Sequence, residues 1–203
     1  TLNMNNFEKS LMAAARKTFV DYEKLTGGWW LMHGPESFLQ NGIALDLRKQ
    51  ADILVYPECS PKRVKADHNI VKIGRPPKTS QQQRFDLVTW WKNGTPRAIV
   101  ELKLAYDIRP IRKDAEKLLE FRKEARDVFR SGYLLVYSEA RIKPKKEGAL
   151  FAAKTGLENR FDLWTKYLKE FRFKEIDRFA KQPPGEVEGY ICSYGFVLYR
   201  IDF

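Results

Sequence analysis

Residues 84–104 read RFDLVTWWKNGTPRAIVELKL, and this stretch decides the fold. Two apolar runs of strand length, 85–91 and 97–104, flank a short polar segment that contains Asn93-Gly94. Asn-Gly between two such runs is a strong signal for a tight hairpin turn. The stretch therefore predicts an antiparallel pair of strands.

The predicted hairpin brings charged residues together. A two-residue turn at residues 93–94 sets a register in which Asp86 lies opposite Glu101, although Pro96 can distort it. Because side chains alternate along a strand, Lys103 lies on the same face. Two opposed carboxylates are unfavourable without a counter-ion, and carboxylate oxygens suit a hard divalent cation. A nearby lysine could hold an attacking water or stabilise charge on a phosphate.

The rest of the chain predicts an α/β protein with a mixed central β-sheet flanked by helices. After the hairpin, a helix over 110–130 and the unbroken apolar run 133–137 form a crossover to a strand covered on both faces. The other expected elements are helices over 6–25, 35–49 and 158–173, a strand over 53–56 that Pro57 stops, and one or two strands within 189–203. Asn6 is the expected cap of the first helix and Gly27 follows its end.

An ordinary hairpin with an exposed ion pair between Asp86 and Lys103 is the alternative interpretation, because Glu-x-Lys alone is common. The combination is more specific: an aspartate at a strand start, a hairpin, Val-Glu-Leu-Lys in an apolar strand, and a crossover. It resembles the PD-(D/E)xK nuclease superfamily, the restriction-endonuclease-like fold, with Phe85 where the family usually has proline. The resemblance covers about residues 34–138 of what is expected to be one domain over 1–203, with N- and C-terminal additions.

This resemblance implies a metal-dependent endonuclease, a hydrolase that cleaves phosphodiester bonds, most simply in DNA. Asp86 and Glu101 would hold Mg²⁺, with Mn²⁺ as a substitute, helped by the main-chain carbonyl of Leu102. Lys103 would orient the attacking water and stabilise negative charge. Asp86, Glu101, Lys103 and Glu36 are therefore the candidate catalytic residues, and Asp86 and Glu101 the candidate metal ligands.

Glu36 is included among the candidate catalytic residues because many family members carry a glutamate on the helix before the first core strand. In Pro35-Glu36 the glutamate occupies that place. Glutamate in a first helical turn also favours the helix dipole, by ~0.3–1 kcal/mol, which is an alternative reason for its presence. Glu58, at the end of the first strand, is the other candidate to complete the acidic cluster.

The composition favours a polyanionic partner. Lys and Arg number 37 against 26 Asp and Glu, a net charge of +11. A protein this basic is expected to bind nucleic acid, with an acidic membrane surface and simple solubility as alternatives. No apolar run approaches a membrane span, and no signal-peptide pattern begins the sequence. Cys59 and Cys192 are expected to be buried thiols in a reducing compartment, hence a cytoplasmic protein.

Most of the excess charge lies in two segments. Residues 60–84 hold seven basic residues and one acidic residue, and residues 141–154 hold five and one. These segments are expected to contact phosphates. The helical region 107–130 is nearly balanced, with eight basic and six acidic residues, which is typical of a solvated helix face. His33 and His68, the only histidines, lack the pattern of a two-histidine nuclease and are interpreted as surface or capping residues.

Two functions thus remain in view. The first is the metal-dependent nuclease, and the alternative is a non-catalytic nucleic-acid-binding or protein-interaction module on the same fold. Retention of Asp86, Glu101 and Lys103 together favours the nuclease, because a binding module does not need an acidic pair. The sequence leaves open DNA or RNA, the specificity, endonuclease or exonuclease action, and whether the chain forms a homodimer or binds another protein.

Overall fold

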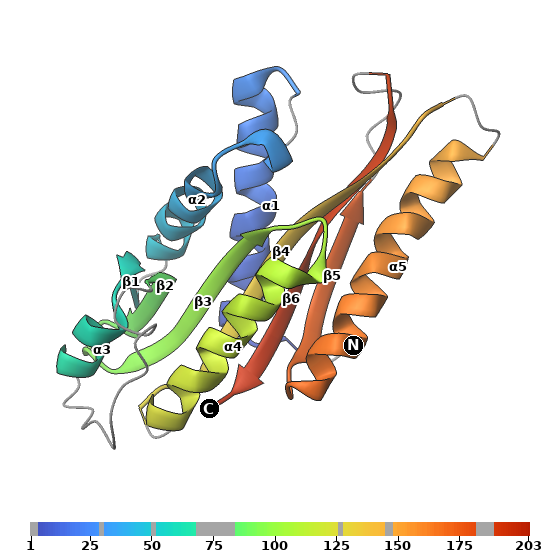
Figure 1. Ribbon diagram of the computed structural model, residues 1–203. Helices are drawn as coiled ribbons and strands as arrows, with labels where there is room; N and C mark the ends of the chain where they lie inside the picture. The colour runs from blue at the N-terminus through green and yellow to red at the C-terminus, as the bar shows by residue number, and fades with distance from the viewer. Residues whose placement is uncertain are drawn as a thin grey trace.

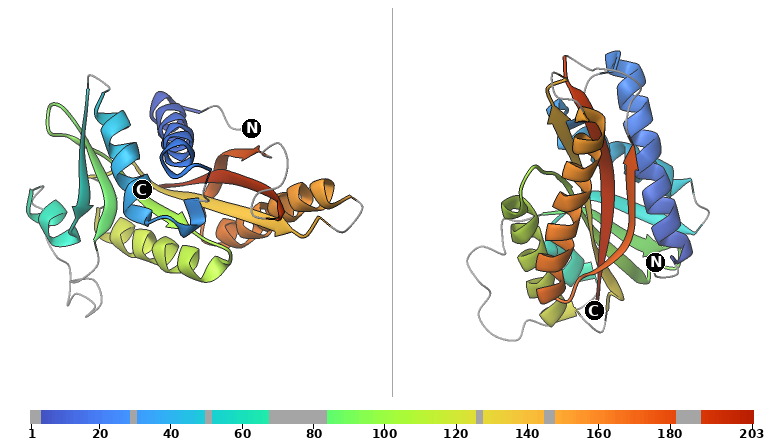
Figure 2. Two further views of the ribbon diagram at one scale, coloured as in Figure 1. Left: turned by 90° about the horizontal axis from the view of Figure 1, so that it is seen from above. Right: turned by 90° about the vertical axis from the view of Figure 1, so that its right-hand side faces the viewer.

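A six-stranded mixed sheet forms the middle layer of the computed structural model, and helices cover both of its faces (Figures 1 and 2). The strand order is β1-β2-β3-β4-β6-β5. β3 and β4 are parallel, and every other neighbouring pair is antiparallel. The prediction of an α/β protein with a mixed sheet flanked by helices is confirmed.

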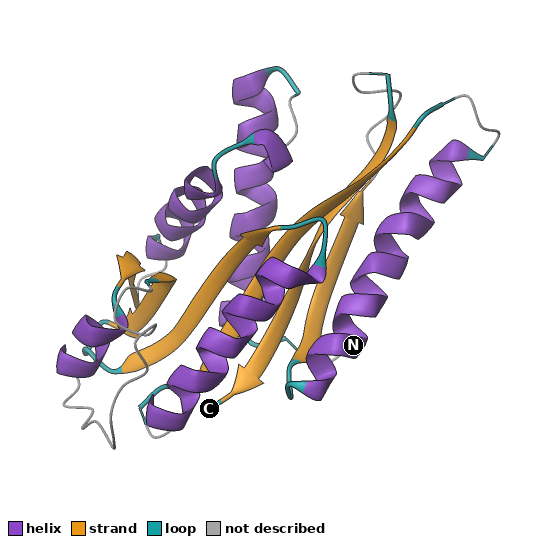
Figure 3. Cartoon of the chain, viewed as in Figure 1, coloured by secondary structure: helices purple, strands orange, loops and turns teal. Residues whose placement is uncertain are grey.

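The structure describes residues 4–28, 31–49, 52–67, 84–125, 128–144, 148–181 and 189–203. Its elements, shown by type in Figure 3, are α1 (Asn6–Thr26), the 3₁₀ helix η1 (Leu31–His33), α2 (Glu36–Arg48), β1 (Ile53–Cys59), α3 (Pro61–Asp67), β2 (Phe85–Trp91), β3 (Pro96–Leu104), α4 (Ile108–Ala125), β4 (Ser131–Ile142), α5 (Ala149–Glu170), β5 (Lys174–Lys181) and β6 (Ile191–Asp202).

Apolar side chains fill the space on both sides of the sheet. α1 and α2 cover one face, where Val100 of β3 is buried, and α4 and α5 cover the other, where Ile99 is buried (Figure 2). Adjacent β3 residues thus point into opposite layers, as the pleat of a strand requires. The same alternation directs the side chains of Glu101 and Lys103 to the face that carries α4.

The predicted helices and strands of the N-terminal half are present, the short helix α3 lies in a segment for which no helix was predicted, and the first helix and first strand differ in detail. Asn5, not Asn6, caps α1: its side chain accepts the Glu8 N–H at 3.0 Å, and the Glu8 carboxylate accepts the Asn5 N–H at 2.8 Å. This reciprocal box satisfies two N–H groups that the first turn leaves unpaired. β1 continues through Pro57, which was expected to end it, because an edge strand tolerates a residue without an N–H.

The C-terminal half is more regular than its sequence indicates. α5 begins at Ala149 rather than Glu158, because Ala153 and Leu157 extend the buried stripe of Phe161 backwards along the helix. β4 continues well past the predicted apolar run of 133–137, to Ile142. The tail forms the single strand β6, and the charged edge strand β5 had no predicted counterpart.

The β2–β3 turn differs from the predicted one, yet the predicted register holds in the strands. Residues 92–94 form a three-residue loop, closed by the Trp91 N–H donating to the Thr95 carbonyl at 2.9 Å, with Gly94 at φ +81°. Relative to the predicted two-residue turn, a three-residue loop by itself would shift the pairing of the two strands by one residue. Arg97 is an extra residue on β3 opposite the Thr89/Trp90 step, and this irregularity restores the shift.

Candidate active site

Asp86, Glu101 and Lys103 lie on one face of the β2–β3 hairpin. Leu87 pairs with Val100, so the next position of β2 brings Asp86 beside Glu101, as the sequence predicts. A one-residue slip would have placed the two carboxylates on opposite faces. Helix α4 packs against this face of the sheet.

Asp86 is a half-buried carboxyl with one strong hydrogen bond. Its Oδ2 accepts the Leu102 N–H at 2.7 Å. Burial raises the pKa of Asp86 to about 6, although the bond from Leu102 and the charge of Lys117 act in the opposite direction. Near neutral pH the group is thus a carboxylate that is costly to keep ionised, and a bound cation would stabilise it.

Glu101 is almost fully buried, with 1% of its surface exposed. Its Oε2 accepts a bond from Lys117 Nζ at 2.6 Å, whereas Oε1 is buried without a hydrogen-bond partner in the described part of the chain. Burial raises the pKa of Glu101 well above its usual range, and the charge of Lys117 opposes this shift only in part. A buried oxygen without a partner is energetically costly, so this atom is a site at which a ligand would be stabilising.

Helix α4 supplies two charged residues that face the sheet. Lys117 also donates to the Arg84 carbonyl at 2.9 Å and lies 3.6 Å from Asp114 Oδ1. The other Asp114 oxygen lies 3.4 Å from Lys103 Nζ. We refer to Asp86, Glu101, Lys103, Glu36, Asp114 and Lys117 as the hairpin cluster.

The prediction of a solvated helix face over 107–130 is therefore wrong for Asp114 and Lys117, whose side chains are 15% and 12% exposed. A signal for Asp114 was present in the sequence. It follows Ile111 by three residues and precedes Leu118 by four, which places it on the apolar stripe that packs against the sheet.

Glu36 contacts the hairpin cluster through Lys103. Lys103 Nζ lies 2.9 Å from Glu36 Oε1 and 3.2 Å from Oε2, and the Leu104 N–H donates to the same carboxylate at 3.2 Å. Burial lowers the pKa of Lys103, but the carboxylates of Asp114 and Glu36 outweigh it and hold the pKa above its usual value. The amine is thus a fixed cation at the end of β3.

Glu58, the other candidate glutamate, is linked to the hairpin cluster through Gln40. Gln40 of α2 donates through Nε2 to Glu58 Oε1 at 3.0 Å and to the main-chain carbonyl of Asp86 at 2.7 Å. Glu58 adopts the left-handed conformation, with φ +53°, next to the end of β1. The structure thus brings Glu36 to Lys103, whereas Glu58 contacts Gln40.

The donor set fits a divalent cation held by few protein ligands. The four carboxylates and two lysines of the hairpin cluster give it a net negative charge. Within the described ranges, no group of three or more Asp, Glu, His or Cys residues is arranged to hold a metal. Mg²⁺, however, is commonly held by one or two carboxylates, with waters and substrate phosphates completing its shell. Asp86 and Glu101, with its unpartnered Oε1, fit that role.

Much of the predicted basic surface falls outside the described residues. This applies to 68–83, with His68, and to Lys145 and Lys146. Among the described members, Lys62 and Arg63 are exposed at the start of α3, and Lys143 is exposed after β4. Their contact with phosphates stays a prediction.

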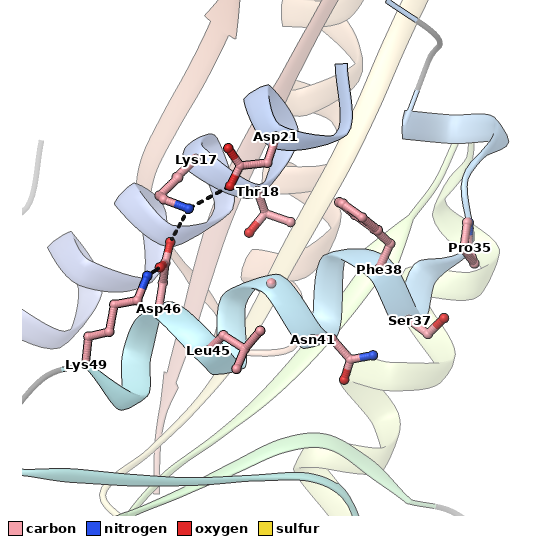
Figure 4. A pocket seen from close by; sticks show the side chains of 11 residues that line it. Lys17, Thr18, Asp21, Pro35, Ser37, Phe38, Asn41, Leu45, Asp46 and Lys49 are labelled. Atoms are coloured by element: carbon pink, nitrogen blue, oxygen red, sulfur yellow. Dashed lines mark hydrogen bonds and ion pairs between the residues drawn. The ribbon is translucent and has the colours of Figure 1, made fainter. Parts of the chain in front are cut away.

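A cleft of about 470 Å³ lies between α1 and α2, away from the hairpin cluster (Figure 4). Its charged residues pair with one another, since Lys17 lies 2.6 Å from Asp21 and 3.4 Å from Asp46, and Lys49 also contacts Asp46. The α2 residues that line it, such as Asn41 and Leu45, differ from those that face the sheet. This cleft therefore does not coincide with the candidate active site.

Other expectations concern the whole chain. Cys59 and Cys192 are buried, as predicted. No helix within the described residues is long and apolar enough to span a membrane.

No family model, curated protein or solved structure matches this chain. Its function is therefore inferred from the hairpin cluster and its surroundings.

Proposed function

We propose that this protein is a metal-dependent nuclease that hydrolyses phosphodiester bonds, with DNA as the expected substrate. One observation carries the proposal. Two carboxylates lie side by side on neighbouring strands, one of them has a buried oxygen without a partner, and a fixed lysine lies two residues away on the same face. Such a pair is unfavourable unless a cation completes it.

Each residue has a role in this proposal. Asp86 and Glu101 would hold Mg²⁺ or Mn²⁺, which would supply Lewis-acid polarisation of the phosphate and a lower pKa for a bound water. Lys103 orients the attacking water and stabilises the negative charge that develops on the phosphate. Glu36 positions Lys103 by accepting its hydrogen bonds. Lys117 limits the repulsion between Glu101 and its neighbouring carboxylates.

We infer a restriction-endonuclease-like core from the same arrangement. The aspartate stands near the start of β2, the Glu-x-Lys pair stands in β3, and α4 leads from β3 to the parallel strand β4. The helix before the first core strand, α2, carries Glu36. These four features support the resemblance that the sequence suggests.

A second candidate function is supported by Lys117. Its ammonium lies 2.6 Å from Glu101 and thus supplies a cation to the buried carboxylate without any metal. In a non-catalytic binding module the hairpin cluster would be a structural network of ion pairs. The two functions differ in whether Asp86 is needed for chemistry.

Cleavage of plasmid DNA and of single-stranded RNA by the purified protein separates these functions. Wild type is compared with Asp86→Asn in Mg²⁺, in Mn²⁺ and in excess chelator. Asp21→Asn is the matched control, because it removes the same charge from an exposed ion pair on α1.

The nuclease proposal predicts cleavage by wild type and by Asp21→Asn, loss of cleavage in chelator, and loss in Asp86→Asn with thermal unfolding no worse than wild type. Equal cleavage by all three forms would show that another site or a contaminant is responsible. No cleavage by any form, with nucleic acid still bound, would favour the binding module.

A further inference from the structure

A second polar cluster lies where β4 extends beyond the end of β3. Leu104, the last residue of β3, pairs with Tyr137, whereas β4 continues to Ile142 alongside β6 (Figure 1). One edge of β4 therefore carries no neighbouring strand over 138–142 in the described sheet. We refer to the residues that gather there, Glu139, Arg141, Arg160, Tyr106 and His33, as the β4-edge cluster.

Glu139 organises one side of this cluster. Its side chain is completely buried, and its Oε1 accepts bonds from the Tyr106 hydroxyl at 2.6 Å and from Arg141 Nε at 2.7 Å. Arg141 also donates to Nε2 of the exposed His33 at 2.7 Å. Because a guanidinium can only donate, this bond selects the histidine tautomer with its proton on Nδ1. Glu139 thus fixes the position of one arginine at the surface.

Arg160, from α5, is held differently. Its NH1 group donates to the Ser138 hydroxyl at 2.8 Å and to the main-chain carbonyl of Glu139 at 2.6 Å. Both acceptors are neutral, and Arg160 forms no ion pair with a carboxylate of the described chain. Its guanidinium lies 5.8 Å from the centre of the Tyr106 ring.

The surroundings of Arg160 favour an anion. The guanidinium is half-buried, and burial lowers the pKa of Arg160, a shift that the negative charge of Glu139 opposes only in part. A partly desolvated cation without a paired carboxylate is costly. Nε and NH2 have no hydrogen-bond partner among the described residues. Two neighbouring donors of one guanidinium match two oxygens of a phosphate.

The β4-edge cluster lies next to the hairpin cluster. The Ser138 hydroxyl that holds Arg160 donates to the Ala105 carbonyl at 2.7 Å. Ala105 follows the last residue of β3, Leu104, and lies two residues after Lys103. His33 precedes Glu36 by three residues.

We propose that Arg160, together with Arg141, binds a backbone phosphate of the nucleic acid close to the phosphate that is cleaved. The position beside a cleaved phosphate rests on the proposed nuclease function, whereas the phosphate contact itself does not depend on cleavage. Ser138 and Glu139 act as positioning residues, because they orient the two guanidinium groups.

Equilibrium binding of a short DNA duplex, measured in chelator over a range of salt concentrations, tests the proposal without any cleavage. Arg160→Gln is expected to weaken binding roughly tenfold, as for loss of a hydrogen bond to a charged group. The slope of log K against log salt is expected to fall by about 0.9, the value for one phosphate contact. Arg160→Lys keeps the charge and should restore the slope with only part of the affinity.

Lys166→Gln is the matched control, because it removes one charge from an exposed position on the same helix and should leave the affinity and the slope close to wild type. A thermal melt accompanies each variant. An unchanged slope in a folded Arg160→Gln variant would overturn the proposal. Inorganic phosphate is a second probe: competition by phosphate alone, equal in wild type and Arg160→Gln, would also overturn it.

A second measurement uses only the wild-type protein, in case Arg160→Gln does not fold. Duplexes that each carry one uncharged methylphosphonate are compared for binding. The proposal predicts a marked loss of affinity at a phosphate other than the cleaved one, and equal binding to all duplexes would contradict it. If wild type cleaves nothing but the Arg160 effect on slope remains, the nuclease proposal fails and the phosphate site stands.

Discussion

Glu101 and Glu139 are both buried, on the neighbouring strands β3 and β4, but their hydrogen bonding differs. Glu139 accepts bonds from Tyr106 and Arg141, and the Tyr137 hydroxyl lies 3.4 Å from its second oxygen. Glu101 has Lys117 on one oxygen and no described partner on the other. One carboxylate is satisfied by the fold, and the other is left with capacity for a ligand.

The difference extends to the clusters around these two residues. The hairpin cluster has more carboxylates than amines, which suits a metal cation. The β4-edge cluster has two arginines and one carboxylate, of which only Arg141 pairs with that carboxylate, and this excess of cations suits a phosphate. An enzyme that uses a metal to act on a polyanion needs both kinds of site side by side. The contrast between two equally buried glutamates thus separates a residue that builds the fold from a residue available for chemistry.

Lys103→Ala is expected to give the largest effect. It leaves Asp86 and Glu101 in place but removes the cation that stabilises the developing charge, so cleavage should fall by ~10²-fold or more. Mn²⁺ binding, measured by calorimetry, should persist. Lys113→Ala is the control, since Lys113 is exposed on α4. Full activity in Lys103→Ala would remove this lysine from the mechanism.

The two glutamates should respond oppositely to replacement by glutamine. Glu139→Gln weakens charge-assisted bonds with Arg141 and should cost about 2–3 kcal/mol of unfolding free energy. For a chain of this size that lowers the unfolding midpoint by about 5–10 °C. Glu101→Gln should leave stability unchanged or raise it, because the fold already disfavours the ionised form of Glu101.

Urea unfolding of both variants in chelator measures this difference. The contrast between the glutamates would be lost if Glu101→Gln were destabilised as much as Glu139→Gln. Glu101 would then be a structural member of an ion-pair network, as in the binding-module alternative.

Asp86 should give a pH dependence of stability in the absence of metal. Its pKa is about 6 in the folded protein against an ordinary value of 3.8. Between these values the folded state retains a proton that the unfolded state releases, so stability falls as pH rises through this window, by about 2 kcal/mol. Asp86→Asn should be more stable than wild type at neutral pH and should lack this contribution. If the unfolding free energies of wild type and Asp86→Asn changed with pH in the same way, the pKa of Asp86 would not be raised in the folded protein.

The two candidate glutamates, Glu36 and Glu58, should differ by a smaller amount. Glu36 bonds directly to Lys103, so Glu36→Gln should lower cleavage about tenfold, the lower end of the effect of residues that orient catalytic groups. Glu58 contacts Gln40, and Glu58→Gln should leave the rate close to wild type. Initial rates at saturating Mg²⁺ measure this, and the opposite ranking would make Glu58 the functional glutamate.

The motif residues could be placed from the sequence because they lie on two strands joined by a short turn. Alternation along the strands and the hairpin signal were sufficient to put Asp86, Glu101 and Lys103 on one face. The detailed turn was wrong, yet the register was right, since the extra loop residue and Arg97 compensate each other. A local sequence pattern can therefore predict which side chains share one face of a hairpin even where it predicts the wrong turn.

The partners of these residues could not be predicted in the same way. Asp114 and Lys117 reach the site through the packing of α4, and charge balance along that helix indicated solvent instead. Glu139 lies beyond the predicted end of its strand, and Arg160 joins it from a helix that follows in sequence. Contacts of this kind depend on tertiary packing, which no local periodicity encodes.

The most direct test of a metal site at the hairpin is a crystal structure with Mn²⁺ soaked at neutral pH or above, read from the anomalous signal of the ion. We expect a peak bound by a carboxylate oxygen of Asp86 and by Oε1 of Glu101, with Lys103 still paired with Glu36. A peak at another place would show that this carboxylate pair does not hold the divalent cation. The absence of any peak, with Lys117 as the only partner of Glu101, would show the same.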